Sequence, residues 1–423
     1  MTKKAGNNEI LTKSVLNLAQ CYVQMNRVEE AMDLHKSLCV EIGKKSMDPD
    51  AILEFAVFLH KNNEDSRALE ILEEHLEAID RSWGKLEQCK AYDIVSPLYY
   101  KKNDFAKSNV YCERHLSIAK ETNNAESEAD ALGGLGINYL RMGEYDNAMA
   151  YFGQALVIDT ERGDDSIGMT YFYMGTVLVA QGGREKEAIL MFQKCVGLFQ
   201  KGNVTIMQSF LKLGQAYTKI EAWDEAIASL EESISSTDSI ADEKLVYNSL
   251  GNQRNFLVKQ SLGNTYLEKY ESLPERNDEV IRKALCWSEA AYDLQNSKGG
   301  VNRALYLDLA QEHYFLGDTE KAHNMLKEYL DATVRLGASH CQSCRQTCAK
   351  DAHMEKCSVC KVARYCSQAH SIQAWKKGRL CHKVMCPLLK RWRKITEGKD
   401  ATAELCDKLF SDFFERVLGS KAK

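Results

Sequence analysis

The stretch Leu135–Ala155 reads LGINYLRMGEYDNAMAYFGQA, and two distant stretches repeat its pattern. These are LAQCYVQMNRVEEAMDLHKSL (18–38) and LGQAYTKIEAWDEAIASLEES (213–233). Each has a small residue, an aromatic residue three positions later and an alanine nine positions after that. The sets are Gly136/Tyr139/Ala148, Ala19/Tyr22/Ala31 and Gly214/Tyr217/Ala226. The shared spacing indicates an internal repeat.

Weaker copies fill the rest of the chain at a period of about 40 residues. They are Ala56 with Ala68, Val95 with Tyr99, Gly175 with Ala188, Gly263/Tyr266 with Ala284 after an insertion of nine residues, and Ala310 with Ala322. Counted from the first position of each unit, the units start near residues 12, 49, 89, 129, 168, 207, 256 and 303. We therefore predict about eight units of similar structure.

Each unit predicts an antiparallel pair of helices, here called helix A and helix B. Glycines such as Gly136 and Gly214 let helix A approach helix B closely, and the alanines let helix B nest against it. Since a lone pair cannot bury its apolar faces, the units must stack on one another. The chain has only four prolines, which suits an almost entirely helical protein because an interior proline breaks a helix.

These units resemble the tetratricopeptide repeat in a long form, over residues 12–337. The resemblance implies an all-α fold, a right-handed superhelix of about eight helix pairs that binds other proteins rather than catalysing a reaction. In such repeats, positions 2, 5, 9 and 12 of helix A usually line the concave groove. Residues at these places include Leu16, Gln20 and Val23; Phe172, Thr176 and Val179; Leu211, Gln215 and Thr218; and Gln260, Asn264 and Leu267.

The expected groove is apolar and lined by amides, which suits an extended or helical peptide whose backbone can bond to them. These residues could equally fill the inner curve of the array. Chaperone-binding members of the family hold a carboxylate with a cluster of Lys, Asn and Arg. Here Lys13 and Lys90 are isolated, so we expect no such clamp.

The second prominent feature is a cluster of cysteines near the end of the chain. Eight of the fifteen cysteines lie between positions 341 and 386. The possible metal ligands are Cys341-x2-Cys344, Cys357-x2-Cys360, Cys366-x3-His370 and His382-x3-Cys386. Two thiolates in a Cys-x2-Cys turn can reach one metal, and residues four apart share a face of a helix. Eight ligands suffice for two tetrahedral zinc ions with no open position, which predicts two structural zinc ions.

This arrangement resembles the MYND-type zinc finger, including Tyr365-Cys366-Ser367, Trp375 and the ending from His382-Lys383 to Cys386. The resemblance implies interleaved ligands: Cys341, Cys344, Cys366 and His370 for one zinc, and Cys357, Cys360, His382 and Cys386 for the other. The gap from His370 to His382 is longer than usual. Cys381 could therefore replace His382, and Cys344-x3-Cys348 is an alternative pair.

The same resemblance implies that the finger docks short proline-containing peptides, with Trp375 and Gln373 as candidate contacts; Trp375 could equally be a core residue. A RING-type ubiquitin ligase would end in Cys-x2-Cys, and a DNA-reading finger in His-x3–5-His, and neither ending is present. Residues 341–394 carry 13 Lys and Arg against 2 Asp and Glu, in a chain of net charge −5. This basic excess alone does not predict binding to nucleic acid.

We expect four segments: an N-terminal tail (1–11), the repeat array (12–337), the zinc finger (338–390), and a basic linker with an amphipathic helix (391–423). Leu405, Leu409, Phe413 and Val417 form the apolar stripe of that helix, which could pack on the zinc module or on the last repeat. No signal peptide or membrane-spanning run is evident, which favours the cytoplasm or the nucleus, where cysteines stay reduced.

The sequence thus predicts a non-enzymatic, zinc-binding adaptor. Its repeats would bind one protein and its finger a second, with no small-molecule substrate and no membrane. Two alternatives remain open, a transcriptional co-regulator and an accessory subunit of a modifying enzyme.

Overall fold

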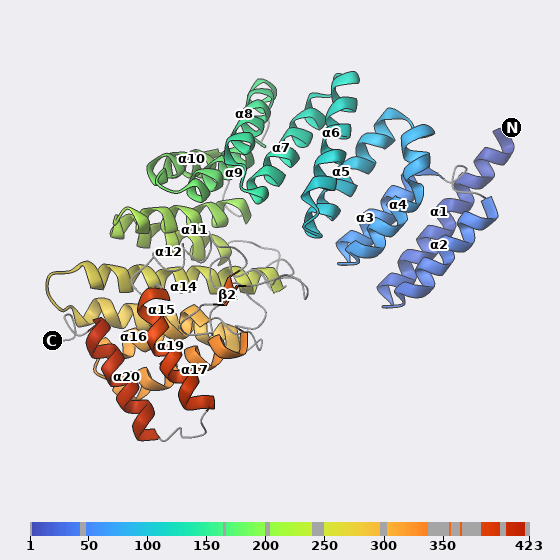
Figure 1. Cartoon of the computed structure of the whole chain (residues 1–423). Helices are drawn as coiled ribbons and strands as arrows, with labels where there is room; N and C mark the ends of the chain where they lie inside the picture. The colour runs from blue at the N-terminus through green and yellow to red at the C-terminus, as the bar shows by residue number, and fades with distance from the viewer. Residues whose placement is uncertain are drawn as a thin grey trace. The chain divides into compact units, whose positions relative to one another are not determined.

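The computed structural model describes most of the chain (Figure 1). The described residues are 2–42, 48–163, 166–198, 204–238, 249–296, 303–336, 355–356, 364–365, 382–397 and 403–418. They form two compact units, Met1–Phe199 (unit 1) and Gln200–Lys423 (unit 2). The division falls inside the predicted repeat array.

Unit 1 consists of five helix pairs. In order they are α1 (Thr2–Gln24) with α2 (Val28–Ile42), α3 (Pro49–Lys61) with α4 (Asp65–Arg81), α5 (Lys85–Lys101) with α6 (Phe105–Glu121), α7 (Ala125–Met142) with α8 (Tyr145–Arg162), and α9 (Ile167–Gln181) with α10 (Glu185–Leu198). Helix α1 already begins at Thr2, so the segment expected as an N-terminal tail is helical there.

Unit 2 contains three further pairs and the C-terminal segment. The pairs are α11 (Val204–Lys219) with α12 (Trp223–Asp238), α14 (Ser249–Ser272) with α15 (Asp278–Asn296), and α16 (Arg303–Phe315) with α17 (Thr319–Leu336). After them come strands β1 (Glu355–Lys356) and β2 (Arg364–Tyr365), then α19 (His382–Glu397) and α20 (Ala403–Leu418). The eight predicted pairs are all present, and the nine-residue insertion lies in the long α14 and the connection after it.

The turn from helix A to helix B is closed in the same way in several pairs. The backbone N–H before helix B donates to a carbonyl five residues earlier, as from Asp104 to Tyr99 (3.0 Å) and from Glu144 to Tyr139 (2.9 Å). The residue directly before the donor has a positive φ, 59° at Asn103 and 80° at Gly143. Asparagine and glycine tolerate this left-handed conformation better than other residues, so the sequence encodes these turns locally.

The glycines of helix A act as the repeat pattern predicts. A Cβ atom at Gly136 would lie 2.7 Å from the ring of Phe152 in α8, and one at Gly175 would lie 2.8 Å from the ring of Phe192 in α10. The alanines that begin helix B, such as Ala148, are fully buried. Helix A and helix B are therefore in close contact because no side chain separates them at these points.

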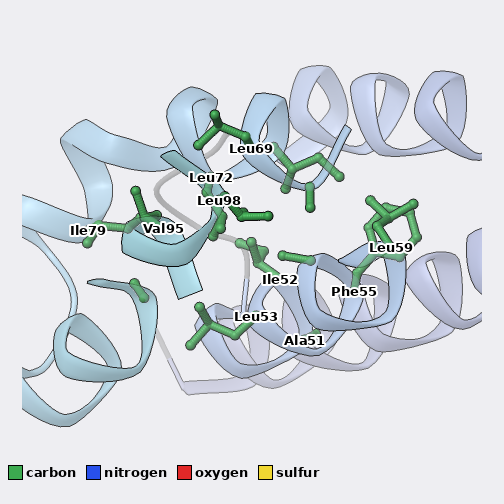
Figure 2. Close-up of a cluster of buried hydrophobic side chains, with 14 of the residues drawn as sticks. Ala51, Ile52, Leu53, Phe55, Leu59, Leu69, Leu72, Ile79, Val95 and Leu98 are labelled. Carbon is green, nitrogen blue, oxygen red and sulfur yellow. The ribbon is translucent and has the colours of Figure 1, made fainter. Parts of the chain in front are cut away.

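Apolar side chains of consecutive pairs form shared buried clusters, one of which extends from Leu16 in α1 to Ile118 in α6. Figure 2 shows part of this cluster, to which Ile52 and Phe55 of α3, Leu72 of α4 and Val95 of α5 belong. Each of these four side chains is at most 1% exposed. Burial of this kind between neighbours supplies most of the stability of a stacked array.

The two C-terminal helices pack on the last repeat pair, which answers the question left open by the sequence. Both α19 and α20 contact α17, and Figure 1 shows the three helices side by side. Phe414 is fully buried and stacks on Tyr314 of α16, with ring centroids 4.6 Å apart. Trp392 of α19 donates from Nε1 to Asp331 of α17 (3.2 Å). The segment expected as a basic linker is therefore largely helical and covers the end of the array.

The predicted apolar stripe of α20 is confirmed in part. Leu409 and Phe413 are buried, and Phe410 and Phe414 beside them are buried more deeply. The side chains of Leu405 and Val417 lie outside the described residues. Within the described part of the chain, no helix is both long and apolar enough to span a membrane.

Two glycines three positions apart on α7 test the close-packing argument. Replacing Gly136 by alanine should destabilise unit 1 by about 1–3 kcal/mol, because the added methyl group overlaps the Phe152 ring. Gly133→Ala is the matched control: its Cβ would meet nothing within 4 Å, so the change should be neutral or stabilise by up to about 1 kcal/mol. Urea unfolding measures both, and equal effects would contradict the argument.

The C-terminal cover can be tested at Phe414. Phe414→Ala should destabilise unit 2 by about 3–5 kcal/mol, since it removes a fully buried ring and its stacking on Tyr314. Hydrogen–deuterium exchange in α16 and α17 should rise in this variant. Glu415→Ala, at an exposed neighbouring position, is the control and should leave that exchange unchanged.

Candidate functional site

Most of the predicted zinc ligands lie outside the described residues. This holds for Cys341, Cys344, Cys357, Cys360, Cys366 and His370, for the alternatives Cys348 and Cys381, and for the candidate peptide contacts Gln373 and Trp375. The structure therefore leaves the predicted ligand set untested. Over the part of the chain that is described, no three His, Cys, Asp or Glu side chains gather as a metal site would require.

The last predicted pair, His382 and Cys386, does lie on one helix. His382 is the first residue of α19, and Cys386 follows one turn later on the same face. Cys386 is 2% exposed, in the core of unit 2 beside Met385 and Leu389. Consequently, the helix that carries this pair is the same helix that packs on α17.

A short hairpin lies among the other predicted ligands. Strands β1 and β2 pair antiparallel, with Glu355 opposite Tyr365 and Lys356 opposite Arg364. The seven residues between them include Cys357 and Cys360, and Cys366 directly follows β2. Cys357 and Cys360 therefore fall in the connection between the two paired strands.

The predicted groove residues divide by chemistry. Most of the apolar ones are buried, among them Leu16 (1% exposed), Leu211 (8%) and Leu267 (5%), whereas Val179 is half-buried. Their burial agrees with the alternative interpretation, in which these residues fill the inner curve of the array. In unit 2, the side-chain amide of Gln215 donates a hydrogen bond to the hydroxyl of Ser261 (3.1 Å). Part of an amide that was expected to bond to a partner's backbone is therefore occupied within the chain.

Two cavities lie along the helices A of unit 1. The first, of about 580 Å³, is bounded by α1, α3 and α5 and includes Gln20, a predicted groove residue. Its charged groups are mixed in sign, and Lys90 bonds Asp50 at 3.1 Å. Lys90 is therefore neutralised by a neighbour.

The second cavity, of about 570 Å³, is formed by helices α5 to α9 and contains three carboxylates, Asp93, Asp130 and Asp159. Tyr100, Tyr173 and Phe152 supply aromatic walls, and Ser96, Ser108 and Asn138 a polar floor. Within that floor Asn138 donates to Ser108 (2.8 Å), whose hydroxyl lies 3.1 Å from that of Ser96. Asp93 lines both cavities, so they adjoin along the same row of helices.

Two carboxylates of the second cavity, Asp93 and Asp130, are electrostatically strained. Burial raises the pKa of Asp130 to about 6, and the negative charges of Asp93, Glu126 and Asp159 add to the effect, against Arg162. Burial also raises the pKa of Asp93, and it lowers the pKa of His115. The side chains of Asp93 and Asp130 reach solvent, but the concave wall limits their hydration.

The sequence analysis did not identify Asp93 and Asp130. The groove rule, applied to the units that start at residues 89 and 129, would have identified both. Asp93 is position 5 of one helix A, and Asp130 is position 2 of the next. Gly133 and Ile137, at positions 5 and 9, also line the cavity. The groove rule therefore identifies cavity residues in the units that start at residues 89 and 129 as well.

Comparison with known proteins agrees with this architecture. The family model for the tetratricopeptide repeat matches residues 131–166 and 209–242, which cover helix pairs in unit 1 and in unit 2. No curated protein sequence matches the chain.

Solved structures also resemble the chain. A STAND signal-transduction ATPase with a tetratricopeptide-repeat sensor, from Pyrococcus horikoshii, is 16% identical with a TM-score of 0.54, over 77% of this chain and 48% of its own. The chain thus spans about half the length of that protein. Aspartyl phosphate phosphatase F from Bacillus subtilis is 15% identical, over 73% of this chain and 77% of its own, with a TM-score of 0.47. At 16% identity, the first match shows the fold alone. The array is a tetratricopeptide-repeat fold.

The electrostatic strain at Asp130 predicts a pH effect on stability. Because its native pKa, about 6, exceeds the ordinary 3.8, the native state holds the proton more tightly, and stability falls as pH rises through that window. Asp130→Asn should remove this fall and stabilise unit 1 by about 1 kcal/mol at about pH 8, once solvent screening is allowed for. Urea unfolding at about pH 4 and pH 8 tests this, with Glu161→Gln on α8 as the control.

Proposed function

We propose that the protein is a non-enzymatic adaptor with two binding parts. The groove of unit 1 holds an extended or helical segment of one partner protein. The C-terminal Cys/His segment binds two structural zinc ions as a MYND-type module and docks a second, proline-containing peptide. Neither part carries out a reaction.

The two adjoining cavities of unit 1 are the observation that carries the first half of this proposal. Their linings run from Gln20 in α1 to Tyr173 in α9 and consist largely of helix A residues. A partner chain laid along this row could contact five successive helices A. Extended surfaces of this kind are what stacked repeats use to bind other proteins.

The zinc module is supported by the chemistry of the donors and by the backbone around two of them. Thiolates and imidazoles are the ligands that zinc prefers, and His382 and Cys386 share one face of α19. The ions would be held by Cys341, Cys344, Cys366 and His370, and by Cys357, Cys360, His382 and Cys386. Zinc with four protein ligands acts structurally, by holding a small module folded.

Metal content is the direct test of the module. The purified full chain should contain about two zinc ions, and Cys341→Ser/Cys344→Ser or Cys357→Ser/Cys360→Ser should each lose at least one. Cys286→Ser, at an exposed cysteine of α15, should retain both. Elemental analysis after gel filtration gives the counts. A wild-type chain without bound zinc would contradict the module.

The adaptor role is tested by comparing the proteins that the full chain and its variants retain. Val57 lines the first cavity, so Val57→Glu should release the partner of unit 1, while Cys357→Ser/Cys360→Ser should release a different partner. Val157→Glu places the same charge at an exposed position of α8 outside both cavities and should release neither. Point variants serve better than deletion of residues 338–423, which would also strip α19 and α20 from α17. The same set retained by every variant would refute the proposal.

A further inference from the structure

The second cavity of unit 1 has an unusual balance of charge. Three carboxylates line it, Asp93 from α5, Asp130 from α7 and Asp159 from α8. No lysine or arginine stands among the described residues of its lining. His115 is buried and its pKa is lowered by that burial, so it is largely neutral near pH 7. The carboxylates therefore lack a matching positive charge inside the cavity.

Among the described residues, Asp159 has one carboxylate oxygen to which no group donates a hydrogen bond. Its side chain is 2% exposed, and Oδ2 accepts a hydrogen bond from Thr170 (3.2 Å). The other oxygen, Oδ1, is buried with no hydrogen-bond partner among the described residues. A buried carboxylate oxygen without a donor costs about 1–3 kcal/mol or more, so folds rarely keep one unless something binds it.

The Arg162 guanidinium lies close enough to Asp130 to oppose the rise in its pKa, but Arg162 is not a residue of the cavity lining. Arg162, on the same helix as Asp159, makes an ion pair with Glu126 at 3.6 Å. Among the described residues, none donates a hydrogen bond to Asp159 Oδ1, so this oxygen is available to a donor from another molecule.

We propose that this cavity holds a basic side chain, an arginine in preference to a lysine, from the partner polypeptide bound along unit 1. This proposal rests on the adaptor function above and specifies the chemistry of the partner. A planar guanidinium can donate to two carboxylates at once, whereas an ammonium group acts as a point charge.

The remaining lining fits the same side chain. Tyr173 and Phe152 stack at 5.5 Å and offer an apolar wall for the methylene stem, and a tyrosine ring also attracts a cation. The shared residue Asp93 connects the cavity to the first one, so a chain that passes along the first cavity reaches this one. That continuity favours a polypeptide over a free small amine.

Minimal ligands can test the cavity without knowledge of the partner. Ile137 and Met169 line it, and their methyl groups report binding in methyl NMR spectra of the labelled full chain. N-acetyl-arginine amide should shift both signals in a saturable way, and the lysine analogue should do so more weakly. N-acetyl-norleucine amide, of similar length without charge, should shift neither. The signal of Met32, buried in α2, should stay constant throughout.

Paired variants separate charge from shape. Asp93→Asn and Asp130→Asn should each weaken arginine binding by about tenfold, since each removes a charged acceptor. Glu161→Gln should leave it unchanged. Gly133→Leu should place a side chain in the cavity and abolish binding, and its Cβ would meet nothing within 4 Å. Gly153→Leu, at an equally open glycine of α8 outside the lining, is the control.

Three results would overturn the proposal. The first is the absence of saturable binding of N-acetyl-arginine amide. The second is equally strong binding of N-acetyl-norleucine amide. The third is loss of arginine binding in Gly153→Leu as well as in Gly133→Leu. Tight binding of spermidine together with no binding of arginine-containing peptides would assign the cavity to free amines instead. The adaptor function is judged separately, by the partners that Val57→Glu releases, so either idea can fail while the other stands.

Discussion

The close contact between helix A and helix B within each pair is the constraint on which the architecture depends. The rings of Phe152 and Phe192 occupy the space where a Cβ of Gly136 or Gly175 would lie. Because helix A and helix B are in close contact on one side, the apolar side chains of each pair pack between these two helices and against the next pair. The opposite side of helix A is then free to be shaped by other residues. In unit 1 those residues form the two adjoining cavities.

The acidic cavity shows how a stable scaffold accommodates a locally unfavourable site. Asp159 is buried with one oxygen unsatisfied, and the pKa of Asp130 is raised to about 6 by burial and neighbouring charge. Beside them Ser96, Ser108 and Asn138 are linked by hydrogen bonds, from Asn138 to Ser108 and between the hydroxyls of Ser108 and Ser96. Strain that the fold does not require is a feature of binding sites, where selection for function opposes selection for stability.

The sequence predicted the repeats well because small residues and turn residues act locally. Gly136 and Ala148 perform in the structure the roles that their spacing indicates, and Gly143 adopts the left-handed conformation that the turn requires. The cavity depends on residues from α5 to α9, and only the groove rule, applied to every unit, could have located it. The element on which α20 packs could not be predicted from the sequence, for another reason. An apolar stripe predicts that a helix is covered, but it does not identify the element that covers it.

The cover on α16 and α17 has a consequence for how this protein can evolve. Internal repeats meet similar surfaces on both sides, so their duplication or exchange preserves the packing. The last pair instead meets α20 through Tyr314 and through His323, whose ring stacks on Phe414 and whose Nδ1 lies 3.1 Å from Asp407. It is adapted to a helix of a different kind. Gain or loss of units by recombination should therefore be tolerated inside the array and rejected at this boundary.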